Sequence, residues 1–123
     1  MSVTFSMPGA AWGWFEGCGI VQQCDDPAWR YDDDPAIHAA AVEAGHALHA
    51  RQGKRVGYGH AWVITCSPEA ARVIREQAAY YPSFGHQLDA EERSELRACE
   101  KLVSRIDAAL RRAGVSIPAG WAQ

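Results

Sequence analysis

The chain has 123 residues, of which 48% are hydrophobic and 22% charged, and its formal net charge is −3. This length suits a single domain over residues 1–123 with a short tail at 115–123, and the composition excludes wholesale disorder. The negative charge argues against binding to nucleic acid or to an anionic membrane, because both need a basic protein surface.

The N-terminal third is predicted to contain short strands. Apolar and polar residues alternate over 2–7, which is the pattern of a half-buried strand. Two further short strands are predicted at 12–15 and 19–23. The aspartate-rich segment 25–34 is predicted to be a loop.

Asp34 followed by Pro35 indicates a helix start, because aspartate caps the free N–H groups and proline fits the first turn. The helix is expected over 35–52, with Gly53 as its C-terminal cap. Its inward face is an alanine-rich stripe at helical spacing. This stripe consists of Ile37, Ala41, Ala44 and Leu48.

The clearest predicted strand covers residues 56–66, where large and small side chains alternate. Ser67-Pro68 then repeats the cap-plus-proline start, so a second helix is expected to run to about Tyr81, where Pro82 stops it. Its expected inward residues are Ala70, Val73, Ile74 and Ala78.

Asp89 and Glu92 have the spacing of a capping box, which predicts a third helix to about Ala113 with Gly114 as its stop. Apolar residues recur along this helix as a heptad seam of less than three heptads. The seam could form a homodimer interface, or it could pack on the second helix as an antiparallel hairpin. The interface residues would be Leu96, Val103, Ile106 and Leu110.

The element order strand(s)–helix–strand–helix–helix predicts an α+β fold, with a small, mainly antiparallel sheet packed on one side by about three helices. No apolar run reaches the roughly 20 residues of a membrane helix, and the N-terminus lacks the pattern of a secretion signal. We therefore expect a cytoplasmic protein with free thiols. Its ten arginines against two lysines and its twenty-two alanines are typical of a bacterial or phage genome rich in GC.

Cys66 and Arg72 have the C-x5-R spacing of cysteine-dependent phosphatases and arsenate reductases. In those enzymes a helix start lowers the thiol pKa and loop amides bind the oxyanion. Here Pro68 lacks an N–H, Glu69 adds negative charge, and the loop has no glycine. An ordinary capped helix is the favoured interpretation.

Histidines give two further hypotheses. His46 and His49 lie three residues apart on the first predicted helix and could share a metal ion, with further ligands from His60, His86, Cys18 or Cys24. Alternatively, these histidines are unrelated residues on a polar flank. His60, between Tyr58 and Trp62, could be a general base, but a buried core histidine is favoured because it has no evident partner. No cofactor is predicted.

Aromatic residues crowd the N-terminal third beside two groups of aspartates. They could bind a protein partner, since Trp and Tyr dominate interfaces, or they could fill the core. The candidate binding surface consists of Trp12, Trp14, Trp29, Tyr31, Asp32 and Asp33.

The favoured function is a non-enzymatic protein-interaction or regulatory module with an unknown protein partner, because no coherent catalytic set is present. The alternative is a small metal- or thiol-dependent enzyme of the hydrolase type that uses His46 and His49 or Cys66.

Overall fold

The computed structural model describes residues 1–56, 59–80 and 88–116. Three strands form one antiparallel sheet with β3 at its centre, in the order β1–β3–β2. The first residue of β1, Val3, lies opposite Cys66 at the end of β3, and Val56 lies opposite Gly59 where β2 meets β3. The strands are β1 (Val3–Pro8), β2 (Gln52–Val56) and β3 (Gly59–Cys66).

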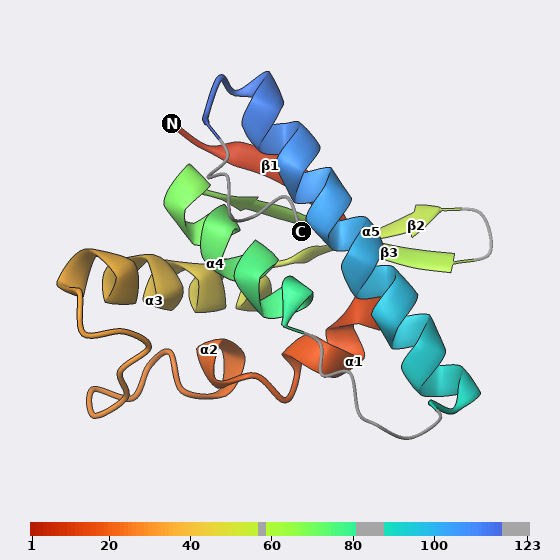
Figure 1. Ribbon diagram of the computed structural model, residues 1–123, viewed down its shortest axis with the longest axis horizontal. Helices are drawn as coiled ribbons and strands as arrows, with labels where there is room; N and C mark the ends of the chain where they lie inside the picture. The colour runs from red at the N-terminus through yellow and green to blue at the C-terminus, as the bar shows by residue number, and fades with distance from the viewer. Residues whose placement is uncertain (57–58, 81–87, 117–123) are drawn as a thin grey trace.

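Three long helices cover one side of this sheet, with α4 between α3 and α5 and with α5 packed on β1 (Figure 1). This arrangement confirms the predicted α+β fold. Within the described part of the chain, no helix has both the length and the apolar character that a membrane crossing needs. The helical elements are η1 (Gly9–Ala11), α1 (Trp12–Phe15), α2 (Gly19–Gln22), α3 (Pro35–His49), α4 (Pro68–Ala79) and α5 (Ala90–Arg112).

Each long helix begins where the capping patterns predict. The side chains of Asp34 and Ser67 accept hydrogen bonds from the first free N–H groups of α3 and α4. Asp89 and Glu92 form a reciprocal capping box at the start of α5. After α5, Gly114 has a φ of 75°, a left-handed conformation that glycine adopts without a steric cost.

The core lies between the sheet and the helices. Phe5 of β1 faces Ile64 of β3, and both are buried, whereas the hydroxyls of Thr4 and Thr65 hydrogen bond at 2.9 Å on the exposed face. The inward residues predicted for α4 are buried as expected. The alternation in β1 therefore predicts correctly which side of this strand faces the core.

The apolar seam of α5 is used within the chain. Ile106 and Leu110 have no exposed surface, and α5 packs against β1 and α4, which is the intramolecular arrangement of the two expected. Leu96 and Val103 are only partly buried. A homodimer through this helix stays a prediction, and only these last two of its four residues retain exposed surface.

Four predicted elements differ from the structure. Trp12–Phe15 and Gly19–Gln22 are single helical turns and not strands. Helix α3 ends at His49, and Gly53, its predicted cap, lies inside β2. The segment 56–66 is not one strand, because its first residue ends β2 and β3 begins at Gly59. Tyr58, Pro82 and the tail from residue 117 lie outside the described residues.

Candidate functional site

The four cysteines are buried free thiols. Burial raises the pKa of Cys18 to about 11. Burial and, to a lesser degree, the Glu43 carboxylate raise the pKa of Cys66 to about 12. The pKa of Cys99 is also raised to about 12, chiefly by burial. A protonated, buried thiol is a poor nucleophile, so Cys18, Cys66 and Cys99 serve as small apolar residues of the core.

The start of α4 already holds a carboxylate of the chain itself. The backbone N–H and the hydroxyl of Ser67 donate to the two carboxylate oxygens of Glu43 at 2.7 and 2.8 Å. The Arg72 guanidinium donates to the carbonyl of Ser116 at 3.0 Å. The C-x5-R segment therefore provides neither a thiolate nor a free anion site, in line with an ordinary capped helix.

The raised pKa of Cys66 predicts a loss of stability in alkali. Below pH 9.0, the ordinary thiol pKa, both states keep the proton; as the pH rises toward about 12 only the folded chain keeps it, so alkali favours unfolding. We expect Cys66 to cost about 1 kcal/mol of unfolding free energy between pH 9 and 10. Urea unfolding at several pH values measures this cost. The free energy of unfolding should fall more steeply with pH in the protein than in Cys66→Ala. Identical pH dependences would contradict it.

The N-terminal aromatic residues pack against the body of the protein. The indole N–H of Trp14 donates to the Gln77 carbonyl at 2.8 Å, and the Gln77 amide donates to the Tyr31 hydroxyl at 3.1 Å. The ring of Trp29 lies 5.6 Å from that of His38 and 6.2 Å from that of Tyr31. These contacts attach the loop before α3 to α3 and α4.

The indole of Trp12 has a cation as its neighbour. The Arg51 guanidinium lies 3.4 Å from the ring centre of Trp12 and 4.5 Å from that of Trp62, a cation–π arrangement that joins α1 to the sheet. Of the predicted binding surface, the four aromatic residues are thus partly buried, and Asp32 and Asp33 are exposed.

His60 is exposed, so the interpretation as a buried core histidine is wrong. With Trp12 and Trp62 it lines a shallow depression of about 530 Å³. The other described lining residues, Pro8, Gly9 and Ala10, offer no side-chain carboxylate or nucleophile to the imidazole. The described residues of the depression therefore give His60 no general acid or base partner.

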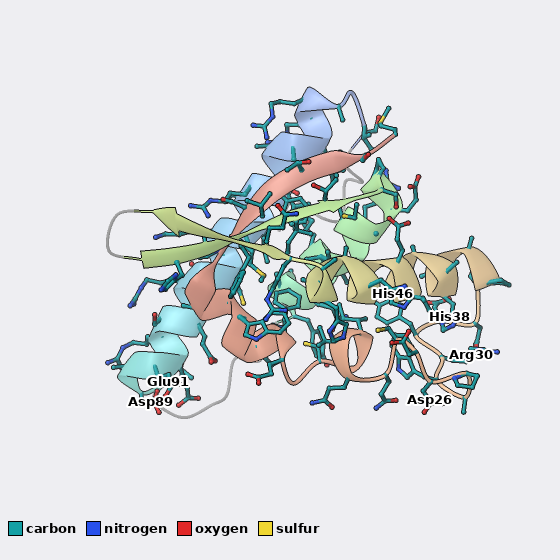
Figure 2. The ribbon with its side chains drawn as sticks, turned by 180° about the vertical axis from the view of Figure 1, so that it is seen from behind. Asp26, Arg30, His38, His46, Asp89 and Glu91 are labelled. Carbon is teal, nitrogen blue, oxygen red and sulfur yellow. The ribbon has the colours of Figure 1, made fainter. Side chains whose placement is uncertain are left out.

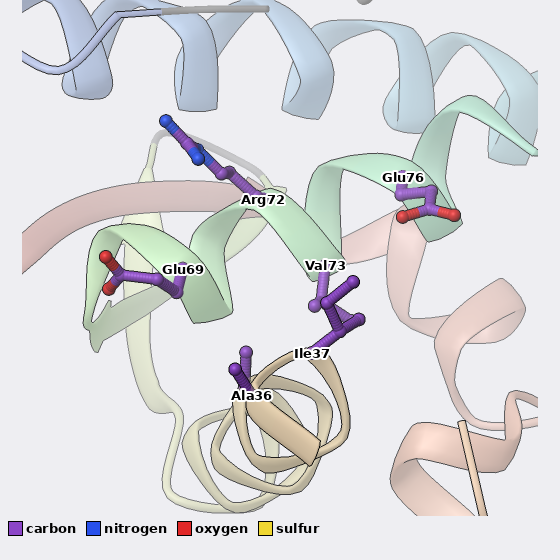
Figure 3. Close-up of a pocket in the computed structure, with 7 residues that line it drawn as sticks. Ala36, Ile37, Glu69, Arg72, Val73 and Glu76 are labelled. Carbon is purple, nitrogen blue, oxygen red and sulfur yellow. The ribbon is translucent and has the colours of Figure 1, made fainter. Parts of the chain in front are cut away.

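A groove opens between α3 and α4, and Ile37 lies at it. Periodicity predicts Ile37 on the inward stripe of α3, but this side chain is 41% exposed, because α4 leaves the first turn of α3 uncovered. Figure 3 shows Ile37 and Val73 pointing toward one another across the groove. The α3–α4 groove has a volume of about 260 Å³ and is lined by Ala36, Ile37, Ala40, Glu69, Arg72, Val73 and Glu76.

Two glutamates border the α3–α4 groove. Glu69 and Glu76 lie on its α4 side and are exposed. Burial raises the pKa of Tyr31 to about 12, and the nearby Glu76 and Asp32 carboxylates add to the rise. Glu76 thus lies both at the groove and near Tyr31, a residue of the predicted binding surface.

His46 meets Cys24 and Asp25 rather than sharing a site with His49. Figure 2 shows His46 on the side of α3 that faces the loop 25–34. Its Nε2 lies 2.7 Å from Asp25 Oδ1, and the donor atoms of the three side chains lie within 4.8 Å of one another. The Nε2 of His49 instead hydrogen bonds the Val21 carbonyl at 2.7 Å.

Among the other predicted metal ligands, Cys18 and His60 lie outside this group, and His86 is outside the described residues. The Cys24 thiol is buried, and its burial and then the Asp25 carboxylate raise its pKa. Asp25 was missed by sequence reasoning. Its position next to Cys24 could have indicated it as a ligand, because any site that uses Cys24 has this carboxylate within reach.

Gly45 permits the close approach that forms this group. A β-carbon at Gly45 would lie 2.6 Å from Cys24 Cβ and 2.8 Å from its Sγ, and it would also overlap the Ile20 carbonyl. Only glycine therefore lets the end of α2 lie directly against α3, one residue before His46.

No protein-family model, no curated protein and no solved structure matches the chain.

Proposed function

We propose that the chain is a non-enzymatic protein-interaction module that binds a basic, amphipathic segment of a partner protein in the α3–α4 groove. The observation that supports this most strongly is the exposed Ile37, which forms an apolar floor with Val73 beside the exposed carboxylates of Glu69 and Glu76. A regulatory role, a cytoplasmic location and a bacterial or phage origin stay predictions from the sequence.

The size of the groove favours a protein side chain over a metabolite. Its volume of about 260 Å³ is below the roughly 300–1,000 Å³ of sites that enclose a small molecule. Such a space suits one or two apolar side chains, and partly buried apolar anchors carry most of the free energy in protein interfaces. The occupant we infer is therefore a segment with an aliphatic or aromatic anchor.

The charge around the groove favours a basic segment. Glu69 and Glu76 border it, Asp32 and Asp33 are exposed just before α3, and the whole chain carries a charge of −3. Arg72 is the one basic residue among the described residues of the lining, and its guanidinium donates to the carbonyl of Ser116. Complementary charge directs a basic partner to this face and makes association depend on salt.

Selection from a random peptide library displayed on phage tests this proposal without knowledge of the natural partner. We expect enriched peptides to carry an apolar anchor flanked by Lys or Arg. Ile37→Arg should lower their affinity at least about tenfold, the cost of losing an interface anchor. The double change Glu69→Lys and Glu76→Lys should weaken binding and reduce its dependence on salt.

Tyr80→Arg is the matched control, because Tyr80 is also an exposed large apolar residue near α4 and is not part of the groove lining. Peptide affinity should be unchanged in this variant. Peptides that bind the protein and Ile37→Arg equally well would contradict the proposal, as would a library that yields no enriched peptide.

The alternative function, a metal- or thiol-dependent enzyme, has one observation in its favour. The Cys66 thiol is buried and protonated, so a thiol mechanism has no support from its surroundings. The group of Cys24, Asp25 and His46 does offer metal ligands.

A further inference from the structure

We propose that Cys24, Asp25 and His46 form a binding site for a divalent metal ion of the zinc class, with a fourth coordination position open to solvent. The three side chains come from the turn after α2 and the last turn of α3. They supply one sulfur, one oxygen and one nitrogen donor within 4.8 Å of one another. This site is independent of the α3–α4 groove.

The donor set indicates the class of ion. Thiolate, imidazole and carboxylate are the three ligand types that zinc takes, and three protein ligands plus solvent are typical of its open sites. Magnesium and calcium prefer oxygen ligands alone, so the sulfur and nitrogen donors disfavour them. A zinc-class ion therefore fits this group better than the hard cations do.

The distances allow an ion to enter with small movements. Metal–ligand bonds of about 2.0–2.3 Å in a tetrahedron place the ligand atoms roughly 3.3–3.8 Å apart. The His46 and Asp25 atoms, now 2.7 Å apart, must separate by less than about 1 Å, and the thiol must approach by a similar amount. The His46 and Asp25 side chains are 55% and 83% exposed, so both can rotate without repacking the core.

The backbone holds the thiol in place before any ion binds. Gly45 allows Cys24 to lie against α3, and the hydrogen bond from His49 to the Val21 carbonyl attaches the end of α2 to the same helix. The alternative is that His46 and Asp25 form an ordinary surface ion pair, for which the neighbouring thiol is irrelevant. Metal binding that depends on Cys24 distinguishes the two.

Titration of the full, reduced chain with Co²⁺ tests the proposal. We expect one ion per chain, a near-ultraviolet band from thiolate-to-cobalt charge transfer, visible bands of four-coordinate Co²⁺, and displacement by Zn²⁺. Cys24→Ser should abolish the near-ultraviolet band. Asp25→Asn and His46→Gln should each weaken binding at least about tenfold, since even residues that only support metal ligands cost that much.

Cys66→Ser and His38→Gln are the matched controls, because they change a buried thiol and a histidine of α3 outside the group; both should keep the bands. Absence of the near-ultraviolet band, its survival in Cys24→Ser, or unchanged affinity in His46→Gln would overturn the site. If Cys24→Ser does not fold, the cobalt affinities of Asp25→Asn and His46→Gln test the site, because these two ligands are exposed. Ile37→Arg should leave cobalt binding unchanged, so failure of the groove proposal is distinguishable.

Discussion

Replacing Asp107 by asparagine should lower the free energy of unfolding by about 3 kcal/mol. Arg75 on α4 is only 4% exposed, and its guanidinium donates to both carboxylate oxygens of Asp107 on α5, at 2.6 and 3.3 Å. Removal of one partner leaves a buried charge without its counter-charge, which costs about 3–5 kcal/mol in buried pairs. We expect a loss at the lower end of this range, because Arg75 has a further interaction besides the pair with Asp107. Urea unfolding followed by circular dichroism measures the change.

Two comparisons show whether burial is the cause. Arg75→Met combined with Asp107→Leu should recover most of the loss, since apolar residues of similar volume often replace a buried pair at little cost. Asp25→Asn, at the exposed pair with His46, should change stability by less than about 1 kcal/mol. A double variant no more stable than Asp107→Asn would contradict this explanation.

The long helices were predictable because their start signals are local. Asp34, Ser67 and Asp89 each bond to N–H groups within three residues, so the sequence alone contains the whole interaction. The strand β1 was predictable for a related reason. Its apolar and polar residues alternate, and this alternation directly indicates a strand in a sheet with one buried face.

The short helices were not predictable, because long-range contacts fix them. Trp14 of α1 bonds to Gln77, which is 63 positions away, and α2 lies where Gly45 permits. A four-residue helix has too few internal hydrogen bonds to be stable alone. Gly53 carries a valid helix-end signal, but pairing of β2 with β3 places it opposite Trp62. The glycine at position 57 was the available hint of a hairpin.

The candidate sites show the same division. Helical spacing predicts that His46 and His49 share a face, but the return of α2 onto α3 gives each a different partner. Periodicity also predicts that Ile37 faces inward. This prediction fails because periodicity cannot show how far α4 extends over α3. The sequence therefore predicts the residues that an element presents, whereas the partners of those residues depend on packing between elements.

Gly45→Ala should lower the free energy of unfolding by about 2 kcal/mol, although alanine is the better helix residue by about 1 kcal/mol. The new methyl group would lie 2.6 Å from Cys24 Cβ and overlap the Ile20 carbonyl. Backbone and a β-carbon cannot rotate away, so α2 must move off α3, and overpacking of this kind costs about 1–3 kcal/mol or more. Urea unfolding of both proteins measures the difference.

The same displacement should weaken Co²⁺ binding at least about tenfold, because it moves the Cys24 thiol away from His46 while all three ligands remain. Gly17→Ala is the matched control. Among the described residues its β-carbon would meet only the Trp14 carbonyl, at 3.8 Å, so stability should change by less than about 0.5 kcal/mol and cobalt binding should persist. A stable Gly45→Ala protein would show that α2 does not depend on this close approach. A destabilised one with unchanged cobalt affinity would separate the packing of α2 from the metal site and contradict the geometry that joins them.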